Sequence, residues 1–215
     1  MLSIQTFILV GVLIFSVVVH EVAHAWQARR EGDDTADRLG RITLNPLPHL
    51  DLFGSIIIPL LLASQGGILF GWAKPVPVNP ANYREYVAGD IRVSMAGIVS
   101  NLGLAALSTL LAGVVLKLTG ATGLGGYIFQ ALDYAIFINL ILAFFNLIPI
   151  PPLDGSHVLA HLLPARLAEG YRELGRYGLL IVMAFVFLAP GALSLLLTPV
   201  YYLQSLADQF IRLWI

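Results

Sequence analysis

The chain has 215 residues, of which 58% are hydrophobic and only 12% are charged, and its formal net charge is -1. Soluble domains carry about a quarter charged residues, so we expect a chain this apolar to have the lipid bilayer as its solvent. The near-zero charge argues against nucleic acid as a partner. The absence of cysteine excludes disulfides, thiolate metal sites and a cysteine nucleophile.

The first predicted membrane span covers residues 4–28. Residues 1–19 have no basic segment and no small-residue cleavage site, and they lead directly into His20 and Glu21. We therefore interpret this segment as a retained transmembrane helix rather than a secretory signal.

An H-E-x-x-H motif, His20-Glu21-Val22-Ala23-His24, lies in this span. Positions i and i+4 of a helix share one face, so both imidazoles can reach one metal ion. Glu21 is placed to take a proton from an attacking water as general base. We predict one Zn²⁺ per chain, because zinc accepts nitrogen and oxygen ligands in a tetrahedral site with one position left for water. Ionisable groups within a membrane helix are costly and usually functional. The alternative to a metal site is a helix that ends at the membrane interface, with both histidines at the interface and Glu21 reaching toward water.

Five further apolar segments cover residues 54–71, 94–118, 128–149, 174–189 and 191–213. Pro59 and the Gly66-Gly67 pair interrupt the first of them, which favours a re-entrant hairpin over a short full span. The prolines that follow, at 75, 77 and 80, suit a strand at the edge of a sheet. The expected fold is an all-α membrane protein of five to six transmembrane helices, with a re-entrant or β-hairpin element around residues 54–80. We expect one domain over residues 1–215.

Basic residues predict the orientation in the membrane. They follow span 4–28, precede span 94–118 and follow span 128–149, whereas the turn at 119–127 holds none. We expect the N-terminus outside and every basic segment in the cytoplasm, including Arg212 near the C-terminal end. This arrangement requires residues 54–71 to enter and leave the membrane on the same side.

A catalytic zinc site of this kind needs a third protein ligand. Asp154 follows span 128–149 in a run that contains Pro149, Pro151 and Pro152, which stiffen the chain and present the carboxylate from a fixed turn. Gly155 lets the backbone bend beside it. We favour Asp154, and the alternative ligand is Asp133 within the apolar span.

The chain resembles the site-2 proteases, the M50 family of intramembrane zinc metalloproteases, in the short branch without PDZ or CBS domains. The matching stretches are residues 20–24, 146–155 and 96–101, and in the last of these Ile98 replaces the family's usual proline. The resemblance implies that His20, His24 and Asp154 hold the zinc, that Glu21 is the catalytic glutamate, and that Asn146 is an active-site amide for the substrate carbonyl or oxyanion. It also implies regulated intramembrane proteolysis of transmembrane proteins, in a prokaryotic plasma membrane, with the active site toward the cytoplasm.

Two polar residues have open roles at this point. His157 would either orient a metal ligand or face the membrane interface. Asn101 would either contact substrate or tie helices together, and we favour the tie. A zinc transporter and a catalytically inactive scaffold are the rival functions. The convergence of polar residues on one site disfavours transport, and the intact Glu21 disfavours the scaffold.

Overall fold

The computed structural model describes residues 3–58, 73–120 and 122–214. Within these residues the chain forms helices and no strand. Residues 73–79 lie in neither a helix nor a strand, so the predicted β-hairpin is wrong for this part of the 54–80 region. The prolines at 75 and 77 offer no backbone N–H to a sheet. Most of the predicted re-entrant segment, residues 59–72, lies outside the described residues.

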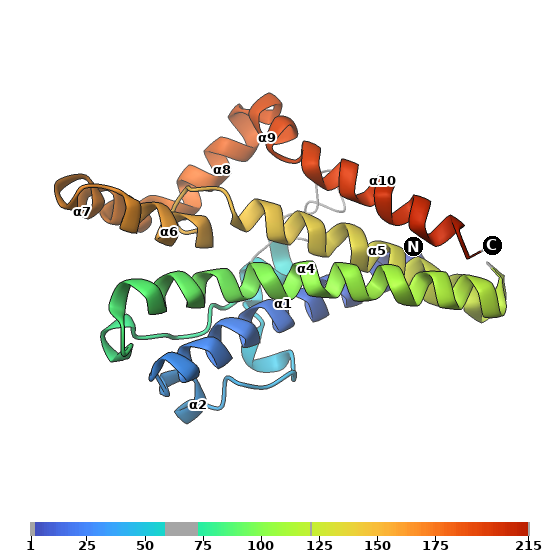
Figure 1. The fold of residues 1–215 in the computed structure, drawn as a ribbon, viewed down its shortest axis with the longest axis horizontal. Coiled ribbons are helices and arrows are strands. Elements are labelled where there is room, and N and C mark those ends of the chain that lie inside the picture. The colour runs from blue at the N-terminus through green and yellow to red at the C-terminus, as the bar shows by residue number, and fades with distance from the viewer. Residues whose placement is uncertain (1–2, 59–72, 121, 215) are drawn as a thin grey trace.

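Three long helices form the body of the molecule: α1 (Ile4–Glu31), α4 (Tyr86–Thr119) and α5 (Gly123–Asn146). Each is long and apolar enough to cross a membrane. α4 packs against both α1 and α5 (Figure 1). The helix α4 continues without interruption through Ile98.

The ends of α1 follow from its capping residues. The Ser3 side chain accepts a hydrogen bond from the backbone N–H of Thr6 at the N-terminus, and the helix ends at Gly32, whose φ of 115° is left-handed. A larger residue at Gly32 would be strained by this φ. Gly32 lies against Asn82 and Arg84, just before the start of α4.

Five helices follow in the C-terminal third: α6 (Asp154–Leu162), α7 (Ala165–Glu173), α8 (Gly178–Leu188), α9 (Pro190–Leu196) and α10 (Thr198–Arg212). The α7–α8 segment and α9 meet at a 94° bend. Together they are long and apolar enough for one broken span or a re-entrant loop. The described residues therefore contain three candidate spans, or four with the bent pair, where the sequence predicted five to six. Part of the difference is that segment 54–71 lies largely outside the described residues. Within the described residues, Pro190 and Pro199 each begin a new helix and split the apolar sequence after residue 174 into shorter pieces.

The short elements are α2 (Thr35–Arg38), η1 (Leu47–His49), η2 (Leu52–Ile57), η3 (Pro80–Asn82) and η4 (Leu174–Tyr177). Buried Asp33, just after α1, holds the region of η3 against the end of that helix. Its carboxylate accepts hydrogen bonds from Asn79 N at 2.6 Å and Asn82 Nδ2 at 2.8 Å. Burial by itself raises the pKa of Asp33, but the hydrogen bonds from Thr35, Asn79 and Asn82 outweigh it and hold the pKa below its ordinary value. Residues 73–79 are thereby held against the end of α1.

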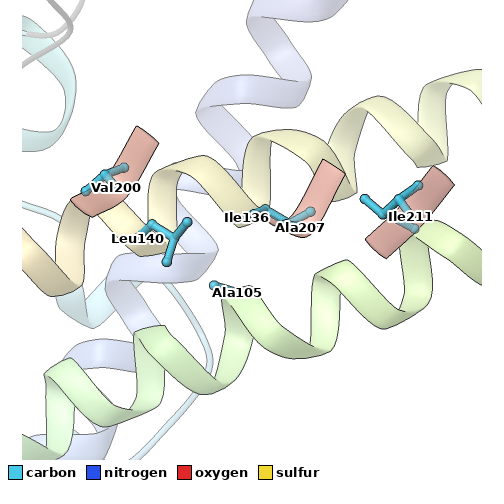
Figure 2. Close-up of a cluster of buried hydrophobic side chains, with 7 residues drawn as sticks. Ala105, Ile136, Leu140, Val200, Ala207 and Ile211 are labelled. Carbon is cyan, nitrogen blue, oxygen red and sulfur yellow. The ribbon is translucent and has the colours of Figure 1, made fainter. Parts of the chain in front are cut away.

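A buried apolar cluster joins the C-terminal halves of α4 and α5 to α10 (Figure 2). Its members are Ala105, Ala112, Ile136, Leu140, Val200, Ala207 and Ile211. Two alanines on α4 let the helices approach closely, as small residues do in membrane bundles. The cluster fixes α10 along the α4–α5 pair.

The C-terminal end of α10 lies at the same end of the bundle as the α4–α5 turn. A Cβ on Gly113 would lie 2.7 Å from Trp214 Cδ1, and Lys117 Nζ lies 5.8 Å from the Trp214 ring centroid. In contrast, α2, the start of α4 and α7 lie at the opposite end (Figure 1). The expectation that Arg212 shares one side with the other basic segments is therefore wrong. The reason is that α8, α9 and α10 together run the length of the bundle once.

Candidate metal centre

The two histidines of the H-E-x-x-H motif lie on one face of α1, one turn apart. Their Nε2 atoms are 3.0 Å apart and their rings meet edge to face. Each Nδ1 has a separate partner on α4: His20 Nδ1 lies 2.6 Å from Asn101 Oδ1, and His24 Nδ1 lies 2.7 Å from the carbonyl oxygen of Val93. Both rings are therefore turned so that Nε2 faces the same point.

Asp154 completes a group of three. Its Oδ2 lies 3.3 Å from His20 Nε2 and 3.4 Å from His24 Nε2. Metal-to-ligand distances of about 2.0–2.1 Å in a tetrahedral site require ligand atoms about 3.3 Å apart. The three separations in this structure match that edge length closely.

The chemistry of these three atoms also fits a cation. A carbonyl oxygen only accepts hydrogen bonds, so His24 Nδ1 carries the proton opposite Val93, and Nε2 of the neutral ring holds a lone pair. Asp154 Oδ2 is buried and has no hydrogen-bond donor among the described residues. Lone pairs that converge in a buried place are stable only around a positive charge. The residues present therefore fit a zinc ion.

Asp154 is delivered by the turn between α5 and α6. It is the first residue of α6, after the proline-containing residues 147–153. Gly155 permits this turn, because a Cβ there would lie 2.3 Å from the carbonyl oxygen of Leu147. The close approach of two backbone segments requires glycine at this position.

Gly97 allows α4 to approach the two imidazoles. A Cβ at this position would lie 2.5 Å from His20 Cε1 and 2.5 Å from His24 Nε2. The sequence around Gly97 carries no signal of this role, since glycines in a small-residue stretch of a membrane helix commonly serve general packing. Its place against the metal-binding face is visible only in three dimensions.

Glu21 lies next to the metal ligands and contacts the extended residues 73–79. Its Oε2 accepts a 2.7 Å hydrogen bond from the backbone N–H of Val76. Arg41 supports this segment by donating from Nη2 to the carbonyl oxygens of Lys74 at 2.9 Å and Pro75 at 3.3 Å. The carboxylate is thus oriented by a part of the chain distant in sequence.

A cavity of about 520 Å³ contains these groups. The three metal-ligand candidates, Glu21 and Asn146 all line it, together with the extended segment. Much of the remaining wall is apolar, including Val17, Val93, Leu142, Phe145, Leu179 and Val182. The cavity therefore combines one polar centre with surroundings suited to an apolar chain.

Asn146 stands at the C-terminal end of α5 on the wall of this cavity. Its Nδ2 donates a 2.9 Å hydrogen bond to the carbonyl oxygen of Leu142 in the same helix. An amide nitrogen carries two hydrogens, so one donor stays available to a bound molecule. The oxyanion role of Asn146 stays a prediction.

The alternative third ligand, Asp133, is placed elsewhere. Its Oδ1 accepts a 3.2 Å hydrogen bond from Gln204 Nε2 of α10. It does not belong to the group that gathers around the two histidines.

A second polar group, Asp90 with His157 and His161, docks α6 onto α4. Asp90 Oδ2 lies 2.7 Å from His161 Nε2 and 3.3 Å from His157 Nδ1. Asp90 and His157 also line the cavity. Because Asp154 begins α6, this docking helps to place the carboxylate. His157 pairs with Asp90 and has no hydrogen bond to the three metal-ligand candidates, all of which are described. No pattern in the sequence pointed to Asp90.

Known proteins with similar sequences agree with the character of this site. Residues 123–189 match the model of peptidase family M50. The chain is 40% identical over 188 residues to "Putative zinc metalloprotease YwhC" of Bacillus subtilis, covering 85% of this chain and 80% of that protein. It is 30% identical over 214 residues to "Putative zinc metalloprotease Rip2" of Mycolicibacterium smegmatis, covering 94% of this chain and 78% of that protein. No solved structure matches the chain at a significant level.

Proposed function

The chain belongs to peptidase family M50, and on that premise we propose that it is an intramembrane zinc metalloprotease that hydrolyses peptide bonds of transmembrane proteins. The observation that carries the proposal is the convergence of His20, His24 and Asp154 beside Glu21, in a cavity walled by candidate membrane helices. The names of the matched relatives support zinc as the metal, and the one group of three converging ligand candidates among the described residues supports one ion per chain.

A bound zinc ion supplies a Lewis acid that polarises the scissile carbonyl and lowers the pKa of the attacking water. Glu21 takes the proton of this water and delivers it to the leaving amine. The hydrogen bond from the Val76 N–H to Oε2 orients the Glu21 carboxylate for this transfer. The free N–H of Asn146 donates to the developing oxyanion.

The substrate must be unwound to be cut, because helical amides are shielded by their own hydrogen bonds. Residues 73–79 run extended beside Glu21 and line the cavity through Ala73, Pro75, Val76 and Val78. We propose that an unwound segment of the substrate lies along them. The apolar wall suits side chains of a membrane-spanning sequence.

We propose a prokaryotic plasma membrane as the location, with lipid around the bundle and no role for nucleic acid. The relatives are bacterial proteins, and the long apolar helices support an integral membrane protein. The metal site lies toward the end of α1 that carries Arg29 and Arg30, since His24 precedes Glu31 by seven residues, about 10 Å along the helix. Basic residues mark the cytoplasmic side, so water would reach the site from there.

Substitution of Glu21 by Gln tests this function. The variant removes the base while keeping nearly the same shape, so we expect it to keep zinc and lose cleavage. Membrane proteins that stay full-length in cells with Glu21→Gln are identified and then offered to purified wild-type protein in proteoliposomes. Cleavage at the wild-type rate by Glu21→Gln would overturn the proposal. Zinc flux into vesicles that is unchanged by Glu21→Gln, without any cleavage, would indicate a transporter.

A further inference from the structure

A chain of buried polar side chains leads away from the metal centre through the core of the bundle. It consists of Asn101 on α4, Asn139 on α5 and Ser16 on α1, which are 0%, 1% and 0% exposed. Asn101 touches His20, a candidate metal ligand, whereas Asn139 and Ser16 touch no candidate ligand directly. Buried polar groups in apolar helices are costly unless each hydrogen bond is made, so the arrangement needs a physical explanation.

Ser16 and Ala135 fix the orientation of the Asn139 amide. Asn139 Nδ2 donates to the carbonyl oxygen of Ala135 at 2.8 Å and to Ser16 Oγ at 2.9 Å. The Ala135 carbonyl can only accept, so the amino group of Asn139 must face it. The oxygen of Asn139 therefore points the other way, toward Asn101.

The orientation passes to Asn101 and then to His20. Asn139 Oδ1 lies 2.7 Å from Asn101 Nδ2, whose other hydrogen faces the backbone oxygen of Ser16 at 3.5 Å. Asn101 consequently presents its oxygen, an obligate acceptor, to His20 Nδ1 at 2.6 Å. The proton of neutral His20 is then held at Nδ1, and the lone pair is at Nε2, which faces His24 and Asp154.

We propose that Asn139, held by Ser16 and Ala135, is a positioning residue that acts through Asn101 to set the tautomer of His20. The hydrogen-bond direction is determined at Ala135 and is transmitted through two amides to the imidazole. This inference rests on the proposed metal site. Without Asn139, only the long 3.5 Å contact to the Ser16 backbone oxygen still orients the Asn101 amide. The amino group can then turn toward His20 in part of the molecules, and the proton of His20 moves to Nε2, where it blocks a metal.

The test compares Asn139→Leu with the wild type in two measurements. ¹⁵N NMR of zinc-free protein labelled only at its five histidines reports which ring nitrogen of His20 carries the proton. Competition with a zinc chelator reports affinity. We expect a mixture of His20 tautomers in the variant and zinc affinity lowered by about 10- to 100-fold.

His24 is the internal control, because its Nδ1 faces the Val93 carbonyl oxygen instead of Asn101. Its NMR signals should not change in Asn139→Leu, whereas a general loss of packing would disturb both histidines. Ser108→Ala, a buried serine seven residues beyond Asn101 on α4, is the matched control for helix packing and should behave as the wild type.

If Asn139→Leu does not fold, Asn101→Leu and Asn101→Asp supply the test. Leu removes the acceptor beside His20 and should give the mixed tautomer. Asp keeps an acceptor oxygen beside His20 and should hold the proton at Nδ1, while its second oxygen, which faces the Asn139 oxygen, lowers stability. An unchanged His20 tautomer in Asn139→Leu, or in Asn101→Leu where the first variant fails, would overturn the inference. The NMR measurement needs neither zinc nor cleavage, so its outcome is separate from the proposed protease activity.

Discussion

The backbone N–H of Val76 donates a 2.7 Å hydrogen bond to Oε2 of Glu21, although 55 residues separate them in sequence. The contact joins the extended residues 73–79 to the glutamate of the H-E-x-x-H motif. It orients the Glu21 carboxylate and leaves lone pairs available to exchange the proton. The segment along which we expect the substrate to lie is therefore hydrogen-bonded to the expected general base.

We predict that Val76→Pro lowers turnover by about tenfold or more while zinc content is unchanged. Proline removes the N–H that orients Glu21, and a general base typically contributes about 10²–10⁴ to the rate. Val76→Ala keeps the N–H and is the matched control, with turnover close to the wild type. Cleavage and zinc are measured on the same preparations. Equal turnover in Val76→Pro and Val76→Ala would show that the hydrogen bond is unimportant.

Gly97→Ala should abolish zinc binding. The added Cβ would meet His20 and His24 at 2.5 Å, so either the imidazoles or the whole of α4 must shift. Gly103→Ala on the same helix is the control, because a Cβ at that position has no neighbour within 4 Å. Elemental analysis should find little zinc in Gly97→Ala and the wild-type amount in Gly103→Ala. Full zinc in both variants would mean that the close approach of α4 is unnecessary.

Asn146→Ala should lower turnover by about 100-fold or more with normal zinc content, because an oxyanion donor is lost. Asn146→Asp should do no better, since a carboxylate offers no donor and repels the developing charge. If Asn146 instead serves only to close the end of α5 through Leu142, the variants would lose thermal stability or zinc together with activity. Cleavage at the normal rate by Asn146→Ala would exclude the oxyanion role.

Single cysteines test the orientation cleanly, because the chain has none of its own. They are introduced at exposed positions in place of Asp37, Arg84, Glu169, Thr122 and Leu213. A membrane-impermeant reagent applied to intact cells should label positions 122 and 213 only. Labelling of 213 together with 37 would contradict the placement of the α10 end beside the α4–α5 turn.

Much of the metal site could be predicted from the sequence, because a helix places residues i and i+4 on one face and prolines mark the turn before Asp154. The contacts between helices could not. Gly97, Asn139 and Val76 acquire their roles by meeting α1 across the bundle, and no spacing along the chain reports such a meeting. In the C-terminal part that the structure describes, the sequence predicted two full spans where shorter helices are found, because hydropathy does not register how Pro190 and Pro199 divide an apolar sequence.

The zinc content of purified protein tests whether His20, His24 and Asp154 hold a metal ion. Two imidazoles and one carboxylate should hold close to one zinc ion per chain, and loss of one ligand should remove most of it. Asp154→Ala is compared with Asp133→Ala, which removes the other candidate acid and leaves the three converging atoms intact. We expect little zinc in Asp154→Ala and the wild-type amount in Asp133→Ala. Full zinc in Asp154→Ala, or its loss in Asp133→Ala, would show that Asp154 is not the third ligand.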